Sequence, residues 1–182
     1  MVVLDAQQDL AEVISSRKMT RRELISLAIV HSDNDAARSL CENYPAGPYA
    51  CIKAMNQKAE ELGMMDTHFI EPTGLSVFNV STAENLVKLV LAASKYPIIN
   101  EDSNKDVIKI RSKKRTAQFN NTNSWVGKGY DFKVSKTGWI TKSGGCIVMM
   151  VDTNNAEKIV VLLGSKNTHT RIPEAKMIAL AY

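Results

Sequence analysis

Cysteine, aromatic residues and net charge are all scarce in this sequence of 182 residues. Its three cysteines, Cys41, Cys51 and Cys146, have no metal-ligand spacing, and their odd number argues against a disulfide framework, so we expect small buried side chains. The net charge is only +4 and is spread along the chain, which gives no support for nucleic-acid binding. No apolar run is long enough for a membrane-spanning helix.

Export signals and metal ligands are missing as well. The opening segment, MVVLDAQQDL, lacks the basic region and the long apolar stretch of a secretory signal. His31, His68 and His169 are isolated from one another, so we expect neither a metal nor any other cofactor. The basic run RSKKR at 111–115 lies between two β-prone segments, and we interpret it as a solvated hairpin turn.

The composition that remains is that of one globular domain over residues 1–182, with 45% hydrophobic and 23% charged residues. Thr20 and Glu23 form a capping box that predicts a helix from about Arg21 to His31. Asp35 or Asn34 then caps a second, short helix. Two further helices are expected, one from Gly47-Pro48 to about Leu62 with a stop at Gly63, and one opened by a capping box of Ser81 and Glu84.

The pattern changes from helical to β-prone at about Asp106. Short runs rich in β-branched residues follow one another, separated by Gly, Asn, Ser or Lys turns. They are DVIKI, TAQFN, DFKVSKTG, CIVMMVD and KIVVLLG, and the segment RIPEAKMIALAY after them reads as a terminal helix. A helical block at about 20–95 followed by strands favours an α+β fold, with the last three strands in an antiparallel meander and the C-terminal helix packed on it.

Two short motifs carry candidate chemistry. Ser32-Asp33-Asn34 falls at the link between two predicted helices, and Lys136-Thr137-Gly138 lies on a predicted strand. These are two of the three signatures of penicillin-binding proteins and class A β-lactamases, the third being Ser-x-x-Lys. Either triplet alone is weak evidence, because serine commonly caps helices and Lys-Thr-Gly commonly forms a turn. Their order and context together give them weight.

The surrounding segments narrow the assignment. HSDNDAA, MNQKAEELGMMDTHFIEPTGLS, NVSTAENL, FNNTNSWV and SKTGWITKSGGC closely resemble the D-alanyl-D-alanine carboxypeptidase and endopeptidase family, particularly its penicillin-binding protein 7 type. The resemblance implies a periplasmic serine hydrolase that attacks peptidoglycan stem peptides or their cross-links through an acyl-enzyme, with β-lactams as substrate mimics. It also implies the domain type, a serine β-lactamase or penicillin-binding transpeptidase-like fold.

Roles for individual residues follow from chemistry and from this resemblance. Lys136 offers a cation to a substrate carboxylate, Thr137 adds a hydroxyl donor, and Gly138 leaves room for a peptide along the strand. Strand alternation puts Lys136 and Gly138 on one face. By the resemblance, the backbone N–H of Trp139 is an oxyanion donor, Ser32 relays a proton to the leaving amine and Asn34 holds the acyl-side amide. Trp139 also suits an ordinary packing role, and the turn Glu71-Pro72-Thr73-Gly74 suits a cleft wall.

The nucleophile motif is the missing part. The resemblance places Ser-x-x-Lys just before a segment like MVVLD, so we expect an N-terminally truncated domain that lacks its nucleophile and the strands that pair beside KIVVLLG. A literal match, Ser15-Ser16-Arg17-Lys18, lies in a polar link before the Thr20 capping box, and we interpret it as coincidental.

Three hypotheses remain open at this point. The chain is a fragment of a true D,D-peptidase, or a pseudoenzyme or partner-completed protein that binds peptidoglycan peptides without cleaving them, or a purely structural protein. The unpaired apolar edge at Ile159–Leu163 favours strand pairing or dimerisation in any of them.

Overall fold

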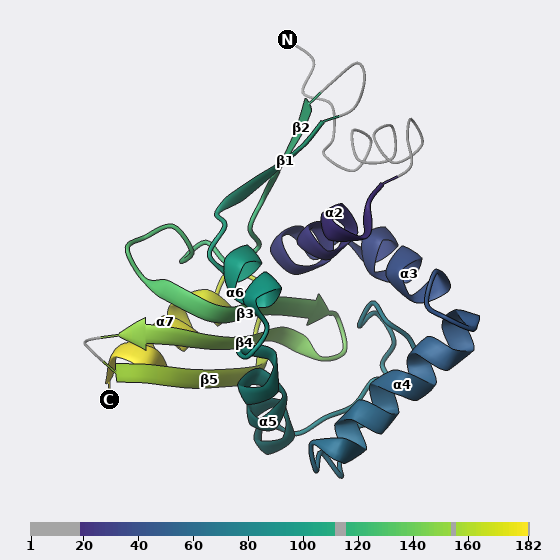
Figure 1. The fold of residues 1–182 in the computed structure, drawn as a ribbon. Coiled ribbons are helices and arrows are strands. Elements are labelled where there is room, and N and C mark those ends of the chain that lie inside the picture. The colour runs from purple at the N-terminus through teal and green to yellow at the C-terminus, as the bar shows by residue number, and fades with distance from the viewer. Residues whose placement is uncertain (1–18, 112–115, 154–155, 182) are drawn as a thin grey trace.

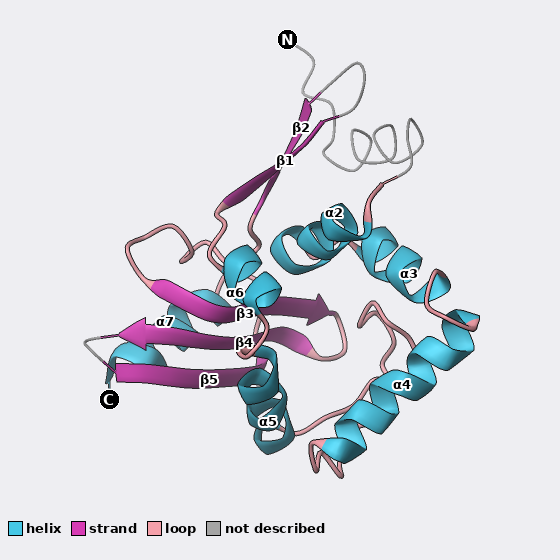
Figure 2. Ribbon diagram, in the orientation of Figure 1, coloured by secondary structure: helices cyan, strands magenta, loops and turns pink. Residues whose placement is uncertain are grey.

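The computed structural model describes residues 19–111, 116–153 and 156–181. An antiparallel sheet lies beside a block of helices that precedes it in the chain, as Figures 1 and 2 show, which confirms the α+β prediction. The helical part consists of α2 (Arg21–Ser26), η1 (Leu27–His31), α3 (Asn34–Glu42) and α4 (Gly47–Glu61). No helix in these described residues is long and apolar enough to cross a membrane.

The central sheet is the predicted meander, with strand order β3-β4-β5 and both pairs antiparallel. Its strands are β3 (Asp131–Ile140), β4 (Gly144–Thr153) and β5 (Ala156–Ser165). Helix α7 (Arg171–Ala181) covers one face, where Ala175 and Ala179 pack against Phe132 and Met149. Helix α5 (Ala83–Ala93) packs on the opposite face through Val90. Each face of the sheet is therefore buried by a different helix.

A separate two-stranded hairpin projects away from the body of the molecule (Figure 1). It pairs β1 (Val107–Arg111) with β2 (Thr116–Asn120), from Val107 opposite Asn120 to Arg111 opposite Thr116. This pairing confirms the hairpin expected around the basic run, although 112–115 lie outside the described residues.

The helix starts agree with the sequence in position but differ in their caps. The Thr20 capping box is present, with the Glu23 N–H donating to Thr20 Oγ1 at 3.2 Å. Asp33, rather than Asn34 or Asp35, caps α3, so that prediction was wrong. The predicted Ser81 and Glu84 capping box was also wrong, because Thr82 caps α5. Helix α6 (Pro97–Ser103) was not predicted at all.

The cysteine prediction needs a correction. Cys41 and Cys51 form a disulfide between α3 and α4, with their Cα atoms 5.4 Å apart, a separation that suits such a bond. Cys146 is free and half-buried. The odd count was misleading because it was applied to all three cysteines together. The short connection between α3 and α4 brings Cys41 and Cys51 within bonding distance.

Candidate active site

Ser32 lies at the tight junction between η1 and α3. The last turn of the first helix widens, so that the Asp33 N–H donates to Leu27 O at 3.2 Å. Ser32 follows this turn in the left-handed region, with φ of 58°. Such a conformation costs a non-glycine residue roughly 1–3 kcal/mol and is concentrated at functional sites. Asp33 then returns to an extended conformation and caps α3 through the Ala36 N–H at 2.6 Å.

Lys136 on β3 reaches this junction directly. Its ammonium donates to Ser32 Oγ and, at 2.6 Å, to the carbonyl of Thr137. The two sequence motifs therefore meet in space although these two residues are 104 positions apart. Ser32 Oγ lies 3.5 Å from Thr137 O, a separation too long for a strong hydroxyl hydrogen bond.

Two cations share the site. Burial lowers the pKa of Lys136 to about 8, and the nearby guanidinium of Arg171 adds to the effect. Arg171, the first residue of α7, is only 8% exposed and donates to Gly138 O at 2.8 Å. Its Nε is buried and has no hydrogen-bond partner among the residues that the structure describes. Within the described part of the chain neither cation is paired with a carboxylate, so the site is prepared for an anion.

These groups line a cavity of about 610 Å³. Its walls come from the η1–α3 junction, a loop after α4 and strand β3, and include Ser32, Asn34, Thr73, Gly74, Gly138 and Trp139. A larger cavity of about 900 Å³ lies between α3, α4 and the segment 68–72, and none of the motif residues lines it. The cavity that joins the motifs is the chemically relevant one, because both unpaired cations lie there.

The predicted binding residues of β3 differ in their surroundings. Among the described residues, a side chain at Gly138 would meet only Cys146 Cβ, at an ordinary 3.8 Å, so their packing does not require glycine there. Trp139 is 48% exposed at the cavity rim. Thr137 is buried and donates its hydroxyl to Thr122 Oγ1 at 2.6 Å, so a ligand would have to exchange that bond.

Glu71 fixes the loop that forms the opposite wall. Its Oε1 accepts from the N–H groups of Gly74 and Ser76 at 2.8 and 3.1 Å and from Asn79 Nδ2 at 2.6 Å. Its Oε2 accepts from the Thr73 N–H at 2.7 Å. Burial raises the pKa of Glu71, but these hydrogen bonds outweigh it and hold the pKa below its usual range. The predicted turn is thus confirmed, and Pro72, Thr73 and Gly74 line the cavity.

Arg171 and Thr122 were not predicted as site residues. Both line the cavity, and each binds an atom of the Lys136-Thr137-Gly138 segment. No local motif marks either of them, because their place depends on how α7 and the 121–130 loop pack. The tetrad Ser15 to Lys18 lies outside the described residues, so its interpretation stays a prediction.

Solved structures that resemble this one define the class as the penicillin-binding D,D-peptidase fold. A DD-transpeptidase of Streptomyces superposes with a TM-score of 0.82 at 22% identity, covering 96% of this chain and 75% of the other. Penicillin-binding protein D2 of Listeria monocytogenes, solved in its cefotaxime-bound form, gives 0.79 at 26% identity and covers 93% and 69%.

Within that class, the chain belongs to the D-alanyl-D-alanine carboxypeptidase family, whose model matches residues 4–167. It is 36% identical to the D-alanyl-D-alanine endopeptidase of Escherichia coli over 98% of this chain and 35% identical to that of Pseudomonas aeruginosa over 96%. The chain spans 64% and 63% of those two relatives.

Proposed function

We propose that this cavity binds the D-alanyl-D-alanine end of peptidoglycan stem peptides, or of their cross-links, as part of a serine-type D,D-peptidase. The observation that carries the proposal is the contact of Lys136 with Ser32 in a cavity that also holds the unpaired Arg171. Family membership and relatives named D-alanyl-D-alanine endopeptidase support the same reading.

Substrate binding begins with the carboxylate. Lys136 and Arg171 are buried cations without an acidic partner among the described residues. A carboxylate bound between them would supply the negative charge that stabilises both cations. The peptide then lies along β3, where Gly138 presents no side chain. Asn34, at the first turn of α3, holds the amide on the acyl side of the scissile bond.

Acyl transfer would use the same strand. Ser135 N–H and Thr137 O both point away from β4, toward α6 and Ser32, so the alternation of the strand turns the Trp139 N–H to that edge as well. There it acts as an oxyanion donor, a contact worth roughly 2.7–4 kcal/mol in the transition state. Ser32 accepts a hydrogen bond from Lys136, which leaves its own proton available for the departing amine.

The nucleophile decides between this function and a second candidate. No Ser-x-x-Lys sequence occurs in residues 19–111, 116–153 or 156–181, and the groups that they supply are binding groups. The second candidate is a pseudoenzyme or partner-completed protein that binds stem peptides without cleaving them. In either case β-lactams are expected ligands, as supported by the ampicillin-bound and cefotaxime-bound relatives from Listeria.

Labelled penicillin, followed by intact mass spectrometry and peptide mapping, tests these alternatives. A stable adduct supports the peptidase, and an adduct on Ser15 would overturn our reading of Ser15 to Lys18. Peptide binding without an adduct favours the non-cleaving protein. Failure to bind either penicillin or a D-alanyl-D-alanine peptide would refute both.

A periplasmic location is part of the proposal. The Cys41–Cys51 disulfide supports it, because disulfides persist in oxidising compartments such as the bacterial periplasm.

Strand pairing at β5 is the proposed route to a partner. Among the described residues β5 pairs only with β4, so the edge at Ile159–Leu163 is open to another strand. Sedimentation at rising protein concentration should show dimers that Leu163→Lys weakens. A chain that stays monomeric at every concentration would contradict self-pairing.

A further inference from the structure

Helix α6 separates the two elements that carry the site. On one side it contacts η1, which ends at Ser32, and on the other it packs against β3, which carries Lys136 (Figure 1). Two adjacent residues of α6, Asp102 and Ser103, are both 0% exposed. Their side chains bind these two neighbours separately.

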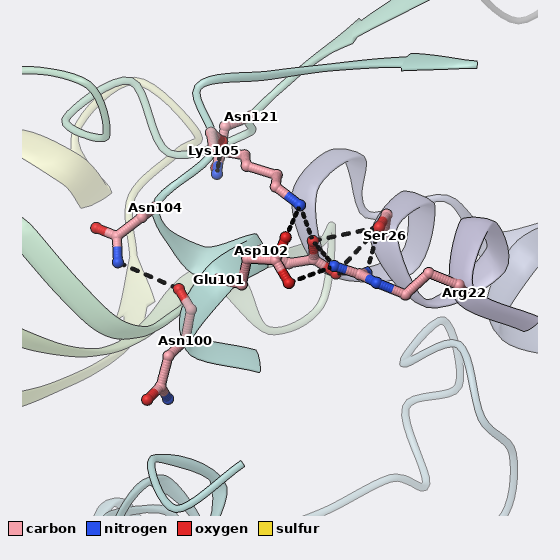
Figure 3. A network of polar contacts seen from close by, with 8 residues as sticks. All are labelled: Arg22, Ser26, Asn100, Glu101, Asp102, Asn104, Lys105 and Asn121. Carbon is pink, nitrogen blue, oxygen red and sulfur yellow. Dashed lines mark hydrogen bonds and ion pairs between the residues drawn. The ribbon is translucent and has the colours of Figure 1, made fainter. Parts of the chain in front are cut away.

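Asp102 ties α6 to the helix that leads to Ser32. Arg22 donates hydrogen bonds to both carboxylate oxygens, at 2.5 and 2.9 Å, and Ser26 donates to the same carboxylate at 3.1 Å. Lys105 adds a contact at 2.9 Å. Figure 3 shows the Arg22 and Lys105 side chains converging on Asp102, with Ser26 one turn from Arg22. All four side chains belong to α2 or to α6 and the residues that follow it.

The charge state of Asp102 suits this role. Burial raises its pKa, but hydrogen bonds from Arg22 and Lys105 outweigh burial and leave the pKa below its usual range. The carboxylate is therefore ionised at neutral pH and accepts from both cations. Asp102 is fully buried, so removing its cationic partners would leave an uncompensated charge, and this opposes a shift of α2 along α6.

Ser103 ties α6 to the strand that leads to Lys136. Its hydroxyl accepts the N–H of Ser135 at 3.0 Å, one residue before Lys136. The next residue, Asn104, accepts from the Phe132 N–H at 2.8 Å and donates to Phe132 O at 2.7 Å. These hydrogen bonds fix the position of the outer edge of β3 relative to α6, as far as Ser135, the residue before Lys136.

We propose that Asp102 and Ser103 are positioning residues that hold Ser32 and Lys136 in contact by fixing α2 and β3 to opposite sides of α6. The inference rests on the proposed function, since that contact is what the peptidase cavity requires. Neither residue lines the cavity, so both act through the elements they hold.

The test measures the pKa of Lys136 by NMR titration of chains labelled at lysine Cε, with the signal assigned by its loss in Lys136→Arg. The titratable groups on the same cavity are Asp33 and Arg171, and both stay unchanged in every variant. The variants are Asp102→Asn, Ser103→Ala and, as a matched control, Glu101→Gln, which changes an exposed carboxylate that also binds Arg22 and Lys105.

The sign of the shift separates positioning from simple electrostatics. Loss of an anion through Asp102→Asn would by itself disfavour the charged lysine and lower its pKa. Loss of positioning instead admits water around the ammonium and raises the pKa by about one unit toward its ordinary value. Ser103→Ala should raise it without any change of charge, whereas Glu101→Gln should leave it unchanged.

An unchanged or lowered pKa in Asp102→Asn and Ser103→Ala, with folding confirmed by thermal melts, would overturn the inference. An equal rise in Glu101→Gln would overturn it too. If Asp102→Asn fails to fold, Ser103→Ala decides, because it removes a single hydroxyl. The titration needs no substrate, so this result is independent of whether the chain binds D-alanyl-D-alanine peptides.

Discussion

Replacing Lys136 with alanine should weaken the capture of a D-alanyl-D-alanine peptide by roughly a hundredfold. Burial lowers the pKa of this lysine from the ordinary 10.5 to about 8. Since each pKa unit corresponds to about 1.4 kcal/mol, holding the unpaired cation costs roughly 3 kcal/mol, which a bound carboxylate would recover. This lies within the roughly 2–5 kcal/mol expected for one partner of a desolvated charge pair.

The assay is calorimetric titration with an acetylated tripeptide that ends in D-Ala-D-Ala, compared with the same peptide amidated at its C-terminus. Lys133→Ala is the matched control, because Lys133 lies on the same strand, is half exposed and pairs with Glu157. We expect the free acid to lose affinity in Lys136→Ala only. The amide should bind weakly to the unchanged protein and to both variants.

Two results would refute this reasoning. Unchanged affinity of Lys136→Ala for the free acid would mean that the carboxylate binds elsewhere. An equal loss for the acid and the amide would mean that Lys136 supports the cavity without recognising the carboxylate.

Further expectations concern protons, the cleft wall and the disulfide. From pH 8 upward, peptide binding should be weaker and should be coupled to proton uptake by Lys136, because the bound carboxylate favours the charged lysine. Equal calorimetric heats in buffers of different ionisation enthalpy would contradict this proton uptake. Glu71→Gln should destabilise the fold by about 1–3 kcal/mol in urea titrations, more than Glu61→Gln at the surface. The stability that Glu71 contributes is present above the ordinary glutamate pKa and should be lost as pH falls through its lowered folded value; equal acid sensitivity of both variants would oppose it. Reduction of Cys41–Cys51 should cost roughly 3 kcal/mol, whereas an unchanged melting temperature in reductant would argue against the bond's role.

Local signals were enough to place most elements, and tertiary contacts decided the rest. Ser81 was a sound cap by sequence, but its hydroxyl binds Thr67 Oγ1 at 2.7 Å, which leaves Thr82 to cap α5. Asp33 caps α3 because Ser32 takes the left-handed conformation and makes Asp33 the last extended residue. Such choices depend on neighbours that the sequence does not place.

Helix α6 shows why a short element escapes prediction. It has seven residues, too few for a clear apolar period, and an isolated helix of that length is not stable. Its stability comes from partners far along the chain, namely Arg22 through Asp102, and Ser135 through Ser103. The residues that make α6 a helix are therefore the same ones that position the site.

The candidate site was predictable where a motif was local and unpredictable where packing supplied the group. Ser32 and Lys136 were expected in one cleft, and the structure brings them into contact. Arg171 could not be found in this way, because only the docking of α7 on β4 and β5 brings its guanidinium to Gly138 O. Its buried Nε, which has no partner in the described part of the chain, is a structural signal with no counterpart in the sequence.

The position of the site on β3 follows from how that edge strand is protected. An exposed strand edge attracts other backbones, and α6 prevents this over the first half of β3 through Asn100, Ser103 and Asn104. The helix ends at Ser103, so its protection stops at Ser135, and the next residues face the cavity. A peptide added there would gain backbone hydrogen bonds from the strand while Lys136 holds its carboxylate. Binding is thus expected where the covering helix no longer reaches the strand.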